Sequence, residues 1–218
     1  MATHSQTDEL RLVSLVNAKL CHDLLGPISA LHMVAESLED EDPAMLATSR
    51  KVILDSAAKA LHRLSFFRAA VGRGQNLGSS EARGLVDKVL AEAKIKLEWE
   101  DKLSSAAGEA GPAFLKLAIN LAYLGGHALL GGGSLAVRLD GSAANARIGI
   151  LGSGPRINLE EAGRQALLAG ANCDEAVIAG LDPRSAHPYF TGRIAAGLGL
   201  LVTFPEAAPG TVEIVAAR

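Results

Sequence analysis

Cysteine is scarce in this chain, with only Cys21 and Cys173 among 218 residues. The two lie far apart and share no metal-ligand spacing with histidine or acidic residues, which excludes a disulfide framework and a zinc site. A protein without structural disulfides is typical of a reducing compartment. We therefore expect this chain in the cytoplasm.

A strong charge of one sign is also lacking, because 21 Lys and Arg face 24 Asp and Glu and the net charge is −3. A dedicated nucleic-acid partner is excluded, since such binding needs a basic surface. Residues 1–9 hold no apolar core of a signal peptide. The charge-free run 117–137 is broken by Asn120, His127 and three consecutive glycines, so we expect no membrane span.

Two long segments of helical periodicity open the chain. Apolar residues recur at steps of three, four and seven, which predicts a helix over about 8–38 and a second over 44–71, with an acidic turn at 39–43. Two amphipathic helices cannot enclose their own apolar stripes. We therefore expect the hairpin to pair with a second copy as a four-helix bundle, which makes the protein a homodimer.

A glycine-rich polar stretch at 72–80 predicts a linker, which divides the chain into a helical-hairpin domain at 1–74 and an α/β domain at 75–218. The second part alternates predicted helices and strands, with a largely antiparallel sheet. The fold class is α+β, with a dimeric helical hairpin and a two-layer α/β sandwich. The expected helices are 82–93, 112–130, 158–169 and 188–196, and the expected strands are 94–98, 134–140, 146–151, 200–204 and 211–216.

One histidine of the first helix is placed for reactivity. His22 lies two positions from both Leu20 and Leu24 of the apolar stripe, which turns its side chain about 200° away from that stripe. A neutral imidazole can attack an electrophile only where a partner reaches it. A lone surface histidine is usually just solvated, so the neighbouring residues must show whether His22 has a function.

Those neighbours resemble the phosphoacceptor box of two-component histidine kinases, in which a small residue, the histidine, an acid and an apolar residue are followed by a proline. The matching residues are Cys21, His22, Asp23, Leu24 and Pro27. The resemblance implies that Asp23 assists proton handling at His22. The proline, which removes a helical hydrogen bond, is expected to distort the helix just beyond the site.

The order of a helical hairpin and an α/β domain also resembles these kinases, whose second domain binds ATP. Asn120 stands where the first of two magnesium-binding asparagines would be, but Leu124 replaces the second. Ile150 occupies the place of the aspartate that contacts adenine, in front of the glycines at 152 and 154. An apolar side chain there leaves the adenine donor unpaired, so we expect a degenerate domain without ATP binding.

The whole pattern is similar to the ChpT-type histidine phosphotransferases of alphaproteobacterial phosphorelays, carried by segments 20–27, 63–72, 117–130 and 188–190. His127 departs from this pattern, since an acid is expected there. The resemblance implies that His22 takes a phosphoryl group from an aspartyl phosphate on one receiver domain and passes it to another. These receivers would belong to a hybrid histidine kinase and to response regulators. The protein would need no cofactor of its own, because the Mg²⁺ belongs to the receiver.

Small residues and one methionine lie on or near the side of the helix that carries His22, where a receiver helix could dock. The expected docking residues are Gly26, Pro27, Ser29, Ala30 and Met33.

Two other functions stay open from the sequence. The chain could be an autophosphorylating kinase core, or a non-catalytic dimeric binding module of the same fold. Cys21 beside the histidine is either a small packing residue or a redox-sensitive thiol.

Overall fold

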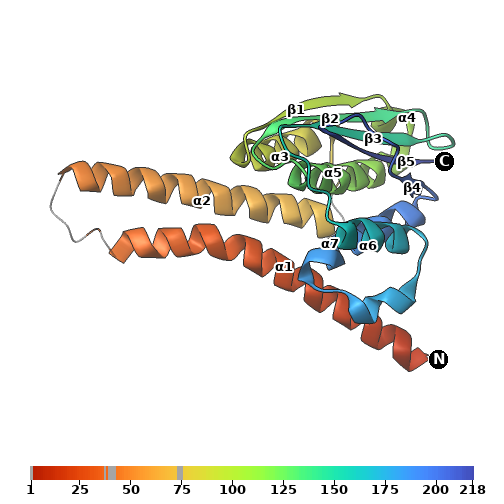
Figure 1. The fold of residues 1–218 in the computed structure, drawn as a ribbon, viewed down its shortest axis with the longest axis horizontal. Helices are drawn as coiled ribbons and strands as arrows, with labels where there is room; N and C mark the ends of the chain where they lie inside the picture. The colour runs from red at the N-terminus through yellow and green to blue at the C-terminus, as the bar shows by residue number, and fades with distance from the viewer. Residues whose placement is uncertain (1, 37, 39–42, 73–75) are drawn as a thin grey trace.

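The computed structural model describes residues 2–36, 38, 43–72 and 76–218. A long helical hairpin projects from a domain of helices and one sheet (Figure 1). Among the described helices, none combines the length and the apolar character that crossing a membrane requires.

The hairpin consists of helix α1, Ala2–Glu36, and helix α2, Pro43–Val71. The two run side by side in opposite directions, and α1 curves along its length (Figure 1). The helix predicted over 44–71 is confirmed, whereas α1 begins six residues before the predicted start. Most of the acidic turn and the predicted boundary at 74 and 75 lie on residues outside the described ranges, so the division into two domains stays a prediction.

The C-terminal part is built on a five-stranded sheet in the order β1-β2-β3-β5-β4. Strands β1 and β2 are parallel and the other neighbouring pairs are antiparallel. The largely antiparallel sheet and the α+β class are therefore confirmed. The strands are β1 Ile95–Asp101, β2 Gly133–Asp140, β3 Arg147–Ser153, β4 Leu201–Thr203 and β5 Thr211–Ala217.

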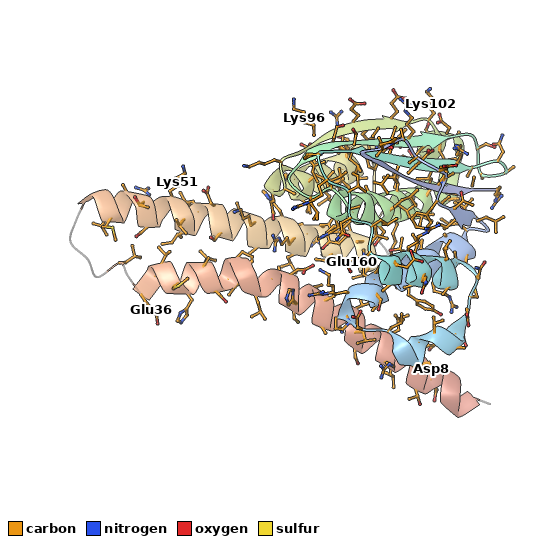
Figure 2. All side chains as sticks on the ribbon, viewed as in Figure 1. Asp8, Glu36, Lys51, Lys96, Lys102 and Glu160 are labelled. Carbon is orange, nitrogen blue, oxygen red and sulfur yellow. The ribbon has the colours of Figure 1, made fainter. Side chains whose placement is uncertain are left out.

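Helices cover one face of this sheet and separate it from the hairpin (Figure 1). The side chains of Lys96 and Lys102 project from the other side of the sheet, while Glu36 and Lys51 lie on the distal part of the hairpin (Figure 2). The helical elements are α3 Ser79–Glu92, α4 Leu103–Ala106, α5 Gly111–His127, α6 Glu161–Ala171 and α7 Pro183–Gly197, with short 3₁₀ segments η2 Gly108–Ala110 and η3 Glu175–Gly180.

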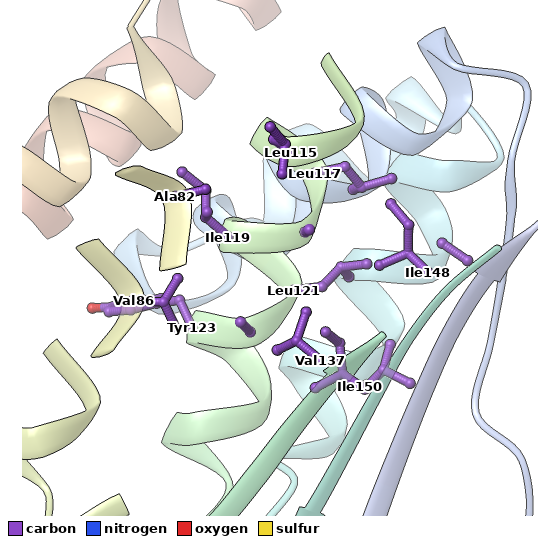
Figure 3. Packing of buried hydrophobic residues seen from close by; sticks show 14 of the residues in the cluster. Ala82, Val86, Leu115, Leu117, Ile119, Leu121, Tyr123, Val137, Ile148 and Ile150 are labelled. Atoms are coloured by element: carbon purple, nitrogen blue, oxygen red, sulfur yellow. The ribbon is translucent and has the colours of Figure 1, made fainter. Parts of the chain in front are cut away.

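Helix α5 is the centre of the core. Leu117 and Leu121 of α5 are fully buried, as are Val137 and Ile150 of the facing strands (Figure 3). Each such side chain contributes about 1.5–3 kcal/mol by leaving water. The helix approaches the sheet so closely that a Cβ on Gly125 would lie 2.8 Å from the Cγ2 atom of Ile150. The apolar run 117–137 is thus a buried helix, a turn and the start of a strand.

Helix α7 begins earlier than predicted, at Pro183 rather than at Pro188. The Asp182 carboxylate accepts from the backbone N–H of Ser185, whose hydroxyl in turn accepts from the Asp182 N–H. This reciprocal capping box fixes the helix start, and proline is well suited to the first helical position. Pro188 therefore lies inside the helix. Helix α6 is likewise displaced from the predicted 158–169 to 161–171.

The tight contact between α6 and α7 predicts that alanine at two glycines of α6 will affect the free energy of unfolding differently. A Cβ added at Gly170 would lie 2.1 Å from the Tyr189 carbonyl oxygen, whereas one at Gly163 meets its nearest atom, Pro188 Cγ, at 3.8 Å. We expect Gly170→Ala to lower the free energy of unfolding by about 1–3 kcal/mol through overpacking. Gly163→Ala on the same helix should be neutral or stabilising by up to about 1 kcal/mol. Urea denaturation measures both, and equal effects would contradict the close approach.

Candidate functional site

His22 lies in the middle of α1 with its side chain 84% exposed. The prediction that the imidazole faces water is confirmed. Its Nδ1 atom is 3.3 Å from the Oδ1 atom of Asp23, whose own side chain is only 12% exposed. An exposed ring therefore projects from the helix beside a carboxylate that is held largely inside the protein.

The Asp23 carboxylate is held from two elements. Lys19, one turn earlier on α1, contacts both oxygens at 2.6 and 2.5 Å. Tyr123 of α5 donates its hydroxyl hydrogen to Asp23 Oδ2 at 2.9 Å. Burial alone would raise the pKa of Asp23, but the hydrogen bond and charge of Lys19 and the hydroxyl of Tyr123 lower it below its ordinary value. The carboxylate is ionised at neutral pH.

The proline of the motif explains a second link between the same elements. Pro27 has no N–H, so the Asp23 carbonyl lacks the hydrogen bond that residue 27 would donate in an ordinary helix. Arg63 of α2 supplies it, with Nη1 2.6 Å from that carbonyl oxygen. The same guanidinium contacts Glu92 of α3 through Nε and Nη2 at 3.0 and 2.8 Å. Helices α1, α2 and α3 are thus joined at the residue next to His22.

Aromatic rings hold Tyr123 in place. Its ring stacks on Phe66 with centroids 4.9 Å apart and meets Phe67 and His187 edge-on at 5.6 and 5.3 Å. The hydroxyl points away from the sheet residues Val137 and Ile150 (Figure 3). Burial and the charge of Asp23 raise the pKa of Tyr123, so the hydroxyl keeps its proton and acts as a donor.

The predicted docking residues differ in their accessibility. Gly26, Ser29 and Met33 are exposed, and by helical geometry they lie within about 40° of His22 around the axis. Ala30 is half-buried. Pro27 is buried, so its surface is not available to a partner and its assignment to a docking surface is wrong. Because Pro27 has no N–H, it leaves the Asp23 carbonyl to accept the hydrogen bond from Arg63.

Asn120 does not serve as a magnesium ligand in this arrangement. Its side chain is completely buried, and its Nδ2 donates to the carbonyl oxygens of Ala70 and Lys116 at 3.0 and 2.7 Å. Its Oδ1 lies 2.8 Å from Nε2 of His187 and accepts that hydrogen bond. The amide therefore ties the end of α2 to α5 and α7, and its oxygen is buried and already accepts one hydrogen bond.

The residues at the other expected nucleotide positions are equally unsuited. Leu124 lines a cavity of about 320 Å³ at the end of α5, and Ile150 is 1% exposed within β3. Neither offers a carboxylate or amide. Within the described ranges, no group of three or more His, Cys, Asp or Glu side chains could hold a metal ion.

Sequence reasoning missed several residues that position the site. Lys19 could have been found, because an acid four residues away on a helix is an expected ion-pair partner. Arg63 had an indirect signal in Pro27, which frees a carbonyl. Tyr123 and Glu92 had no signal in the sequence. The hydrogen bond from Tyr123 to Asp23 spans 100 positions, and the one from Arg63 to Glu92 spans 29.

Comparisons with known proteins agree with this geometry. Residues 79–209 match the family model described as the histidine phosphotransferase C-terminal domain. The chain is 29% identical over 211 residues to protein phosphotransferase ChpT of Brucella abortus (strain 2308), covering 93% of this chain and 94% of that protein. A solved structure described as a bacterial phosphotransferase superimposes with a TM-score of 0.76 and 27% identity, over 95% of this chain and 96% of the other.

The hairpin with an exposed histidine and the α/β domain behind it define a fold that is shared with the solved bacterial phosphotransferase. Because the family model covers more than half of the chain, the chain belongs to the histidine phosphotransferase family. The resemblance to its ChpT-type members is confirmed.

The burial of His187 behind the site predicts how the stability of the protein depends on pH. Burial first, and then the charge of Lys19, lower the pKa of His187 from 6.5 to about 3. Below pH 6.5 the unfolded chain binds a proton that the folded chain refuses, so stability should fall by up to about 1.4 kcal/mol per pH unit towards pH 3. His187→Gln keeps a donor for Asn120 and should flatten this slope in urea titrations.

His127 provides the comparison for that measurement. His127 lines the cavity at the end of α5, and desolvation there lowers its pKa. Unlike His187, however, His127 is partly in contact with solvent. His127→Gln should therefore change the slope less than His187→Gln. A slope that both variants leave intact would contradict the assignment.

Proposed function

We propose that this protein is a histidine phosphotransferase that carries a phosphoryl group between receiver-domain aspartates through Nε2 of His22. The observation that carries the proposal is the pairing of an exposed imidazole with a half-buried, ionised carboxylate next to it. When Nδ1 donates its hydrogen to Asp23, the neutral ring presents the lone pair of Nε2 to solvent. That nitrogen is then available as a nucleophile.

Phosphoryl transfer needs few further catalytic groups from this chain. Phosphoryl transfer proceeds through a loose in-line transition state, so positioning and charge neutralisation dominate its catalysis. We propose that Mg²⁺ on the receiver supplies the neutralisation and that this protein contributes the nucleophile and its orientation. In the forward step the bond from Nε2 to phosphorus forms as the bond from phosphorus to the aspartyl oxygen breaks, and the reverse step loads a second receiver.

We further propose that the protein does not bind ATP. The oxygen and nitrogen of the Asn120 amide are engaged inside the protein, and an isoleucine side chain cannot accept the adenine hydrogen bond. These features favour the phosphotransferase over an autophosphorylating kinase.

Exposed apolar side chains of the hairpin support the proposal of a homodimer. Leu54, Leu61 and Leu64 of α2 are 61, 62 and 50% exposed and lie at steps of seven and three, as on one helix face. Leu25 and Ile28 of α1 are also exposed, at 59 and 49%. An apolar surface of this kind is suited to a second copy of the same hairpin. We propose a four-helix bundle in the cytoplasm, with receivers docking at Gly26, Ser29, Ala30 and Met33.

A transfer assay tests the proposed function. Purified protein is mixed with a panel of receiver domains that carry ³²P-labelled aspartyl phosphate, with ATP alone in a parallel tube. We expect label on the wild type, none on His22→Ala, and none from ATP. Label from ATP would restore the kinase, and absence of label from every receiver would favour the binding module.

Two substitutions on the hairpin should separate dimerisation from phosphoryl transfer. Leu61→Glu should convert the dimer into monomers, because it places charge in the apolar face, and light scattering after size exclusion measures this. Ser29→Arg should keep the dimer but slow transfer from receivers, because it fills the surface next to His22. Leu201→Glu, at a 68% exposed leucine on β4, is the control for added charge. Unchanged transfer in Ser29→Arg would refute the docking surface.

A further inference from the structure

We propose that Tyr123 is a positioning residue for His22, through which the C-terminal domain sets the reactivity of the histidine without any nucleotide. This inference rests on the proposed function of His22. Tyr123 does not touch the reacting nitrogen: it holds the carboxylate that holds the imidazole.

The geometry leaves one carboxylate oxygen for His22. Tyr123 donates to Oδ2 of Asp23, while Oδ1 is the atom 3.3 Å from Nδ1 of His22. Lys19 contacts both oxygens at nearly the same distance, so it does not select which of them faces His22. The Tyr123 hydroxyl bonds Oδ2 alone and therefore restrains rotation of the carboxylate that would turn Oδ1 away from the exposed ring.

Tyr123 is rigid enough for this task. A ring stacked on Phe66 and met edge-on by Phe67 and His187 has little freedom to turn. A hydrogen bond from a fixed donor costs less entropy than one from a mobile side chain. The Arg63 bond to the Asp23 carbonyl secures the backbone of the same residue, so the side chain and main chain of Asp23 are both held from outside α1.

The consequence concerns the orientation of the imidazole. The nitrogen that keeps the proton is decided by the hydrogen bond that the other ring nitrogen makes. A carboxylate held in place favours the proton on Nδ1 and leaves Nε2 as the nucleophile. If Tyr123 is removed, Asp23 turns more freely, and the fraction of His22 with a free Nε2 falls.

The chain offers a matched pair of variants, because it has only two tyrosines. Tyr123→Phe deletes the hydroxyl that bonds Asp23 and keeps the ring. Tyr189→Phe deletes the hydroxyl of the other buried tyrosine, which donates to the Asp174 carbonyl at 3.2 Å and makes no hydrogen bond to Asp23 among the described residues. Any loss of activity caused only by a looser C-terminal domain should occur in both variants.

Phosphoramidate serves as the phosphoryl donor, because it needs no docking surface. The lone pair of His22 Nε2 forms a bond to phosphorus as the P–N bond of phosphoramidate breaks, and the nitrogen, already protonated in the donor, leaves as ammonia. We expect Tyr123→Phe to be labelled about tenfold more slowly than wild type, a difference of about 1.4 kcal/mol. Tyr189→Phe should be labelled at the wild-type rate, and His22→Ala should not be labelled. With a receiver as donor, kcat should fall in Tyr123→Phe while KM stays unchanged.

The two proposals fail differently. Labelling of wild type but not of His22→Ala, with equal rates in Tyr123→Phe and wild type, would overturn the role of Tyr123 and leave the phosphotransferase intact. Equal losses in both tyrosine variants would reduce Tyr123 to a structural residue. If wild type takes no label, the proposed function fails, and ¹⁵N NMR of His22 then decides alone: an unchanged tautomer ratio in Tyr123→Phe would overturn the positioning role.

Discussion

The hydrogen bonds around Asp23 are the constraint on which the rest of this structure depends. The side chain of Asp23 meets Lys19 and Tyr123, and its main-chain carbonyl meets Arg63. Through these contacts, helices α1, α2 and α5 meet beside His22, whose side chain is exposed to water. An uncompensated buried carboxylate would be costly, so each partner both stabilises the fold and fixes the site.

The C-terminal domain supports the hairpin through residues that stand at the expected nucleotide positions. Asn120, placed where a magnesium ligand is expected, instead joins α2, α5 and α7 by hydrogen bonds to Ala70 and His187. Ile150 adds apolar packing where an adenine contact is expected. Its α5 helix carries Tyr123, and the aromatic rings packed around that tyrosine limit the movement of its hydroxyl.

The sequence was sufficient for elements whose signals are local. The helix at 44–71 follows from apolar periodicity, and the exposure of His22 follows from its two-residue offset from the apolar stripe. The start of α7 was missed although Asp182 and Ser185 form a readable capping box. Pro27 was assigned to the surface because a motif does not show which way a helix is packed. The bond between Tyr123 and Asp23 depends on tertiary packing of distant segments, and no periodicity encodes it.

We propose that Asp23, held by its partners, leaves one particular nitrogen of His22 to carry the phosphoryl group. The most direct test is ³¹P–¹⁵N correlation NMR of the phosphorylated protein with ¹⁵N-labelled histidine, which identifies the bonded nitrogen. The account predicts a single phosphohistidine at His22, with phosphorus on Nε2. Phosphorus on Nδ1, or on another residue, would contradict it.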